Sequence, residues 1–333
     1  MLKTKLSKIG ITLAFLALYP LKAAASSFTD FVFLGDSITD SGNVFFATGE
    51  TETPPFERTV ARRPYNDTLN FSNGLVWAQY LANFNGLNAN PSLIGGTNFA
   101  FGGATSQSLD EVLSPSLEEQ LGFWQSATGN NADPNAFYFV QGGGNDIREL
   151  AQGRVSANTP EEFLQDSANA VKGVVRELID AGATNIAVLN APDLGLTPEA
   201  IASDFSPQVT ALSQFYNNSV EQALGSLDTK DINLIEVDLF GFIRSITDDP
   251  TAFGLPASTV TDVPCVLPNS VCSNPDRFVF YDAIHPTTAS HLALANVVNQ
   301  QINDSVAPVP EPSTLILGLG CTLVLAKKRK YIK

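Results

Sequence analysis

Continuous apolar runs alternate with amphipathic segments along the middle of the chain. Four runs, three of them rich in β-branched or aromatic side chains, are candidate strands: Phe31–Leu34, Ala136–Val140, Ile186–Leu189 and Ile232–Val237. A weaker candidate for a fifth strand is Thr97–Phe101. Apolar runs of this kind, rather than strictly alternating patterns, are typical of strands that are buried on both faces of a parallel sheet.

One long segment carries helix signals at its start, along one side and at its end. Thr159 can cap a helix that begins at Pro160, and Gly182 stands where a helix-ending glycine belongs. Apolar residues recur between them at gaps of three and four: Leu164, Ala168, Val171, Val175 and Leu178. Strands alternating with such helices predict a three-layer α/β/α sandwich with a mostly parallel, five-stranded, flavodoxin-like sheet. Functional groups are then expected beyond the carboxyl ends of the strands.

Residues 1–25 have the order of a secretory signal peptide. Three lysines within the first eight residues precede an apolar run at Ile9–Tyr19, and the small residues Ala23–Ala25 follow. These are the basic, apolar and cleavage-site parts of such a peptide. The alternative is a buried first helix, which the short run and its small-residue end disfavour.

Residues 306–333 carry a second terminal signal. The stretch Pro310-Glu311-Pro312 precedes an apolar run at Leu315–Ala326, and the basic cluster Lys327–Lys330 follows. Residues 313–326 would make roughly 21 Å of helix, shorter than the ~30 Å hydrocarbon core of a bilayer. This order resembles the PEP-CTERM sorting tail of bacterial envelope proteins, which implies export and sorting machinery as partners, transient membrane contact and removal of the tail. An ordinary membrane anchor is the alternative.

Charge is unevenly distributed between the ends and the body of the chain. Residues 1–25 and 313–333 hold nine basic residues and no acidic one. The body therefore holds ten basic against 34 acidic residues, a net charge of −24. Such a body repels nucleic acid and anionic lipid surfaces, so neither is an expected partner. The functional domain is expected at residues 26–305.

Two of the three cysteines, Cys265 and Cys272, lie seven residues apart in a loop rich in proline and asparagine. In an oxidising compartment they are expected to form a disulfide, with a pair of reduced thiols as the alternative. The third, Cys321, lies in the tail. A zinc site is not expected, because the chain offers only two histidines and no further cysteine nearby, and no cofactor is predicted.

The triplet Gly35-Asp36-Ser37 follows directly on the first candidate strand. A serine just past a buried strand stands at the carboxyl edge of the sheet. A helix that began there would offer free backbone N–H groups to an anion. Both features suit a serine nucleophile. The alternative for this common triplet is a serine that only caps a helix.

Only two histidines could activate such a serine, His285 and His291. Asp282 lies three residues before His285, so on one local turn its carboxylate can reach one ring nitrogen and hold the other toward a substrate. An imidazole in this position can take and return a proton near neutral pH. His291 has no acidic residue among the eight before it and falls inside the predicted last helix. The alternative for His285 is a histidine at a helix start.

Two glycine-containing segments could supply donors for an oxyanion. The segment Asn98–Thr105 contains the pair Gly102 and Gly103, whose backbone N–H groups are unshielded. The segment Gln141–Asp146 follows a strand candidate and places the Asn145 amide at the same edge of the sheet. Glycine-rich loops after strands also bind phosphates. The run Gly142–Gly144, however, lacks the G-x-G-x-x-G spacing of a dinucleotide site, and no Walker lysine follows it.

Together these segments resemble the SGNH branch of the GDSL lipases and esterases over residues 31 to about 298. The matching positions are Ser37 for the nucleophile, Asp282 and His285 for its partners, and Ser37, Gly103 and Asn145 for the oxyanion hole. Ile38 stands where leucine usually gives the family its name, which is a conservative difference. Phe71–Trp77 and Asn190–Pro198 further resemble the bacterial lecithinase/haemolysin-like and plant-type members.

The resemblance implies an exported ester hydrolase that forms an acyl-enzyme on Ser37. A small-molecule or lipid ester is then the expected substrate, and the bacterial cell envelope or the extracellular space the expected location. An acyltransferase that uses the same site is one alternative, and a catalytically silent envelope or matrix protein is another. Phe45, Phe46 and the region around Trp77 are candidates to line a site for the acyl group.

Overall fold

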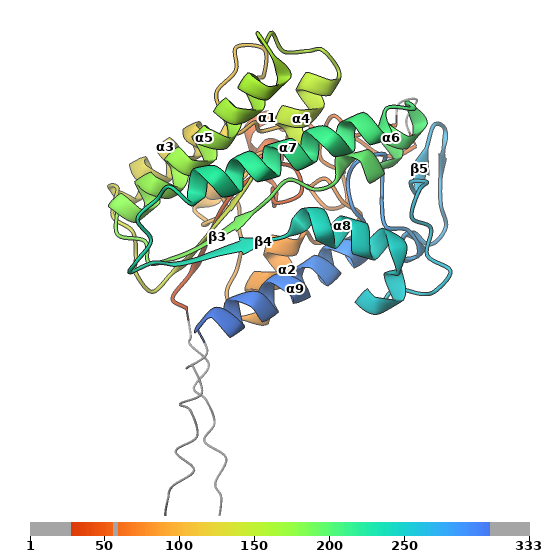
Figure 1. The fold of residues 1–333 in the computed structure, drawn as a ribbon. Helices are drawn as coiled ribbons and strands as arrows, with labels where there is room; N and C mark the ends of the chain where they lie inside the picture. Colours follow the sequence, from red (N-terminus) through yellow and green to blue (C-terminus); the bar gives the residue numbers. More distant parts are fainter. Residues whose placement is uncertain (1–27, 56–58, 307–333) are drawn as a thin grey trace, which may run out of the picture. The chain divides into compact units, whose positions relative to one another are not determined.

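A parallel sheet forms the middle of the fold in the computed structural model, which describes residues 28–55 and 59–306 (Figure 1). Its strands pair in chain order: β1 (Phe31–Leu34), β2 (Phe137–Gln141), β3 (Asn185–Leu189) and β4 (Asn233–Val237). The register aligns Phe33 with Phe139 and Val140 with Val188. The four stronger strand predictions are therefore confirmed.

The weaker candidate, Thr97–Phe101, does not form a fifth strand. It runs beside β1, where the Phe99 N–H donates to the Phe33 carbonyl at 2.7 Å, but it makes only isolated bridges, one of them between Phe33 and Asn98. The Asn98 side chain accepts the Ala100 N–H at 3.0 Å, a local turn that competes with ladder pairing. The layered fold class is confirmed, but the expected number of five strands is wrong, because this segment turns after single bridges.

Helices cover both faces of the sheet (Figure 1). On one face lie α2 (Trp77–Phe84), α8 (Leu239–Asp248) and α9 (Thr288–Val306), and on the other lie α3 (Leu117–Thr128), α5 (Pro160–Asp180) and α7 (Ser206–Leu224). Shorter helices are α1 (Asn43–Thr48), α4 (Gly144–Ala151) and α6 (Pro198–Ala202). Single 3₁₀ turns are η1 (Ser92–Ile94), η2 (Leu194–Leu196), η3 (Pro250–Phe253) and η4 (Pro275–Arg277).

Alternate residues of each strand separate into two hydrophobic cores. Phe33 and Phe139 point to the core shared with α2, α8 and α9, where their rings stack at 4.9 Å between centroids. Leu34 and Val140 point to the core shared with α3, α5 and α7. Because both faces of the central strands are buried, polar residues are excluded from them, which explains the apolar runs in the sequence.

The long helix α5 begins and ends as its sequence predicts. The Thr159 side chain accepts the Glu162 N–H at 3.1 Å, and Pro160 is the first helical residue. At the other end, Gly182 has a φ of +107° and its N–H donates to the carbonyl of Ile179. This positive φ is why a glycine ends the helix, since a side chain would be strained there.

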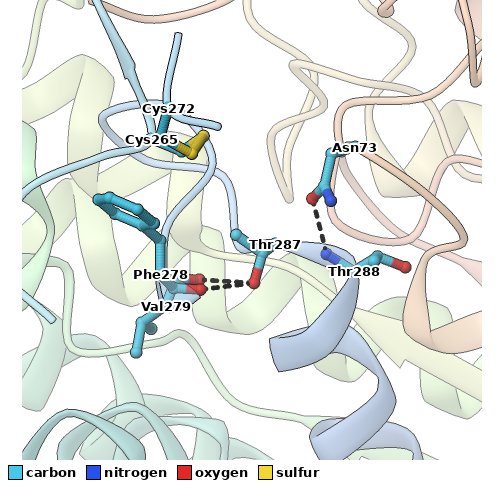
Figure 2. The surroundings of a disulfide bond; sticks show 7 residues. All are labelled: Asn73, Cys265, Cys272, Phe278, Val279, Thr287 and Thr288. Carbon is cyan, nitrogen blue, oxygen red and sulfur yellow. Dashed lines mark hydrogen bonds between the residues drawn. A yellow bond between two sulfur atoms is a disulfide. The ribbon is translucent and has the colours of Figure 1, made fainter. Parts of the chain in front are cut away.

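A short hairpin, β5 (Val266–Leu267) and β6 (Ser270–Val271), carries the disulfide between Cys265 and Cys272 (Figure 2). The Cys265 N–H donates to the Phe280 carbonyl at 3.1 Å, which ties the bonded loop to the chain just before Asp282. In Figure 2, the Thr287 hydroxyl donates to the Phe278 carbonyl at 2.7 Å. The disulfide therefore braces the segment that leads into the predicted Asp–His pair.

The predicted signal peptide and nearly all of the predicted tail, residues 1–25 and 307–333, lie outside the described residues. Within residues 28–55 and 59–306, no helix combines the length and the apolar character needed to cross a membrane.

Candidate active site

The chain turns sharply after β1 and presents Ser37 at the carboxyl edge of the sheet. The Asp36 carbonyl accepts the N–H groups of Thr39 and Asp40 at 3.0 and 2.9 Å, and its carboxylate accepts the Ile38 N–H at 3.0 Å. No helix begins at Ser37, because these bonds close a turn instead. The first helix, α1, starts only at Asn43.

Three side chains meet at this turn in a line of two hydrogen bonds. The Ser37 Oγ lies 3.0 Å from His285 Nε2, and His285 Nδ1 lies 2.7 Å from Asp282 Oδ2. All three residues are buried, Asp282 completely. With the ring proton on Nδ1 and bonded to the carboxylate, Nε2 is free to accept the Ser37 hydroxyl proton.

Asp282 is held by more bonds than its sequence neighbourhood reveals. Its Oδ2 also accepts the Tyr65 hydroxyl at 2.8 Å and the Ala61 N–H at 2.9 Å, and its Oδ1 accepts the His285 N–H at 2.8 Å. Burial alone raises the pKa of Asp282, but the neighbouring His285 and these hydrogen bonds outweigh it and hold the pKa below its usual value. The carboxylate is therefore ionised and fixed in orientation.

Tyr65 and Ala61 were not among the predicted site residues. Tyr65 is 217 residues from Asp282 along the chain, and neither residue belongs to a motif with a chemical signature. No sequence signal could have identified them.

The second histidine lies away from this line. His291 is buried in α9, and its Nδ1 accepts the Trp77 N–H at 3.3 Å. Burial, together with the charge of His285, lowers the pKa of His291 to about 3, so its ring is neutral. It serves as a packed hydrogen-bond acceptor between α9 and α2.

Two backbone N–H groups near Ser37 are free to bind an anion. Within the described part of the chain, the N–H groups of Ser37 and Gly103 have no hydrogen-bond partner. Gly103 is exposed and has a φ of +85°, and a Cβ there would lie 2.8 Å from the Ser114 hydroxyl. Asn145 donates one amide N–H to the Ala104 carbonyl at 2.8 Å, which leaves its other N–H for a ligand.

Two buried carboxylates fix the loop that contains Gly103. Asp40 accepts the Gly102 N–H at 3.0 Å, and Asp146 accepts the Ser106 N–H at 2.9 Å. Burial raises the pKa of each to about 6. The loop is thus tied on one side to the turn that carries Ser37 and on the other to α4, which carries Asn145.

Within the region around Trp77, the tryptophan side chain itself is not available to line an acyl site. Its side chain is completely buried against Phe33 and Phe139, and its Nε1–H donates to the Thr39 hydroxyl at 3.0 Å. Through this bond to Thr39, Trp77 holds the turn that carries Ser37.

Among residues 28–55 and 59–306, no group of three or more His, Cys, Asp or Glu side chains is arranged to hold a metal ion.

The same segments match a known family of proteins. A model of the GDSL-like lipase/acylhydrolase family matches residues 31–298, a range that includes Ser37, Gly103, Asn145, Asp282 and His285.

Curated relatives include bacterial and plant proteins. Esterase EstA of Pseudomonas aeruginosa is 27% identical over 311 residues, which cover 83% of this chain and 47% of that protein. GDSL esterase/lipase EXL4 of Arabidopsis thaliana is 26% identical over 349 residues, covering 90% of this chain and 99% of that protein. The chain spans about half the length of the Pseudomonas relatives it matches.

One of the matching solved structures is a catalytic mutant of Axe2, an acetylxylan esterase from Geobacillus stearothermophilus. It aligns with a TM-score of 0.45 and 14% identity, over 82% of this chain and 93% of that one.

Proposed function

We propose that this chain, which belongs to the GDSL-like lipase/acylhydrolase family, hydrolyses carboxylic esters through an acyl-enzyme formed on Ser37. The observation that carries the proposal is the line of hydrogen bonds from Ser37 through His285 to Asp282 at the carboxyl edge of the sheet. A hydroxyl paired with an imidazole, itself oriented by a buried carboxylate, is the arrangement that nucleophilic catalysis needs.

In the first half of the reaction, Ser37 Oγ attacks the ester carbonyl carbon while His285 Nε2 takes the hydroxyl proton. The ring becomes an imidazolium, which the adjacent Asp282 carboxylate stabilises. The carbonyl oxygen becomes an oxyanion, which in this proposal accepts hydrogen bonds from the free N–H groups of Ser37 and Gly103 and from the Asn145 amide.

His285 then returns the proton to the leaving alcohol, and the bond between the acyl carbon and that alcohol breaks. In the second half, His285 takes a proton from water, which attacks the acyl carbon. His285 then returns that proton to Ser37 Oγ as the bond between the acyl carbon and Oγ breaks, which releases the carboxylic acid and restores the free enzyme. Both halves use the same nitrogen, His285 Nε2, as base and then as acid.

A fluorophosphonate probe tests this role of Ser37 directly. The wild-type protein is expected to be labelled on Ser37 and to release acid and alcohol from p-nitrophenyl esters, whereas Ser37→Ala should not be labelled and should hydrolyse the esters on the order of 10⁶ more slowly. Equal labelling of both proteins would show that a residue other than Ser37 is the nucleophile. No labelling of the wild type would contradict the proposal and favour a silent envelope protein. Transfer of the acyl group to an added alcohol in preference to water would identify an acyltransferase instead.

The proposal extends to where the protein acts. The signal-peptide order in residues 1–25 and the sorting-tail order in residues 306–333 support export to the bacterial envelope or beyond, with loss of both ends. The stretches Phe71–Trp77 and Asn190–Pro198 support placement with the lecithinase/haemolysin-like bacterial members. A disulfide in the folded domain agrees with an oxidising compartment.

Loss of the tail gives a specific mass-spectrometric expectation. Protease Asp-N cuts before aspartate, so digestion of envelope protein from the native host should yield the fragment Asp282–Asn303 but not Asp304–Lys333. The first fragment serves as the detection control within the same digest. Recovery of the intact second fragment would show that the tail is retained, as a plain membrane anchor would be.

A further inference from the structure

A cavity of about 400 Å³ opens beside the candidate active site. It is bounded by the end of α4, the turn η2, the helix α6 and the start of α7, elements that lie on one side of the sheet edge (Figure 1). Its apolar lining residues are Ala151, Leu194, Ala200, Phe205, Val209 and Ile284. Phe205 is 61% exposed, so a large apolar surface stands open to a ligand at the rim.

Direct connections place this cavity next to the reacting groups. Ile284, in its wall, immediately precedes His285. Arg148, also in the wall, lies one helical turn after Asn145 on α4. The Glu199 N–H of α6 donates to the Ala283 carbonyl at 2.9 Å, which fastens this wall to the segment between Asp282 and His285.

The polar side chains in the wall are already paired with one another or with nearby backbone. Arg148 donates to both Glu199 carboxylate oxygens, at 2.7 and 2.8 Å, and Gln152 donates to the same carboxylate at 3.1 Å. The hydroxyls of Thr197 and Ser203 donate to backbone carbonyls of their own turns. The wall therefore offers an occupant mainly apolar contact, and a charged or sugar-like group would find few unpaired partners.

Two other cavities are poorer candidates for this role. One of about 30 Å³ beneath Ile38 is too small for more than a methyl group or two. One of about 580 Å³ is polar, with Asp248 and Asp262 in its wall, and it includes no direct neighbour of the triad.

We infer that the cavity between α4 and α7 binds the aliphatic acyl chain of the ester, so that the enzyme is selective for medium-length acyl groups over acetyl groups. This inference rests on the proposed function. Each methylene of a linear chain placed in the cavity covers apolar surface of the wall, which favours longer substrates. An acetyl group is too short to reach that surface and gains nothing from it.

The test compares p-nitrophenyl octanoate with p-nitrophenyl acetate, both below their aggregation limits. Wild-type kcat/KM is expected to be at least tenfold higher for octanoate. Ala151→Trp places a bulky ring in the cavity from an exposed position at the end of α4. It should lower kcat/KM for octanoate by roughly tenfold or more and change that for acetate by less than about threefold.

Ala127→Trp is the matched control, because Ala127 is also exposed near the end of a helix, α3, but does not line the cavity. It should leave both substrates unchanged. If Ala151→Trp unfolds, Ser203→Trp fills the cavity from a different element, the end of α6, and decides the matter.

Each remaining outcome is decisive. A wild-type enzyme with equal or lower kcat/KM for octanoate overturns the acyl-chain assignment alone, as does an equal loss for both esters in the tryptophan variants. Cleavage of neither ester by a folded wild-type protein overturns the proposed function, and the acyl-chain assignment with it.

Discussion

Ser37→Ala is expected to lower kcat for ester hydrolysis by on the order of 10⁶, which is the scale of loss when a serine nucleophile is removed from such a unit. This corresponds to about 8 kcal/mol of transition-state stabilisation. The Ser37 side chain makes one hydrogen bond, to His285, so its removal should leave the free energy of unfolding nearly unchanged. Steady-state kinetics and thermal unfolding of the same preparation measure the two effects separately.

The residual activity is as informative as the loss. The free N–H groups at positions 37 and 103 and the Asn145 amide remain in Ser37→Ala, so some catalysis of direct water attack should persist. A double variant, Ser37→Ala with His285→Gln, should be no slower than Ser37→Ala, because nucleophile and base act as one unit. A loss of only tenfold in Ser37→Ala, in a protein free of wild-type contamination, would show that another residue is the nucleophile.

The central part of the fold can be predicted because burial on both faces leaves a mark in the sequence. Phe31–Leu34 is buried at every position, and only an apolar run satisfies that condition. The segment at Asn98 carries an ambiguous mark, since its apolar neighbours suggest a strand. The Asn98 side chain accepts a hydrogen bond from the backbone N–H of Ala100 instead. Whether such a bond forms depends on local conformation, which a pattern of hydrophobic positions does not encode.

In the candidate site, contacts between residues close in the sequence could be predicted, whereas contacts between distant residues could not. Asp282 and His285 are three residues apart, so their pairing follows from one turn of chain. The Tyr65 hydroxyl and the carboxylate of Asp40 complete the site from distant or unremarkable positions. Their contribution is to hold a carboxylate and a loop in place, a role that many polar residues could fill and that no short motif identifies.

His285→Gln is expected to lower kcat/KM by on the order of 10⁶, whereas His291→Gln should keep it within a few-fold of wild type. Glutamine occupies a similar volume and can accept a hydrogen bond, but it cannot take the Ser37 proton. At position 291 its side-chain oxygen can still accept the Trp77 N–H, which is the bond that His291 makes. His285 is 3% exposed and His291 is 1% exposed, so the two substitutions impose comparable packing changes. They differ mainly in whether a group that takes the Ser37 proton is lost.

Two measurements compare the His285→Gln and His291→Gln variants: kinetics with p-nitrophenyl esters and the rate of fluorophosphonate labelling. Labelling should slow sharply in His285→Gln, because the probe also needs an activated Ser37, and should persist in His291→Gln. Thermal unfolding of both variants distinguishes a lost base from a lost fold. An inactive but folded His291→Gln beside an active His285→Gln would reverse the assignment. The Asp282–His285 pair would then be a structural link between the last helix and the Tyr65 segment rather than the base of the reaction.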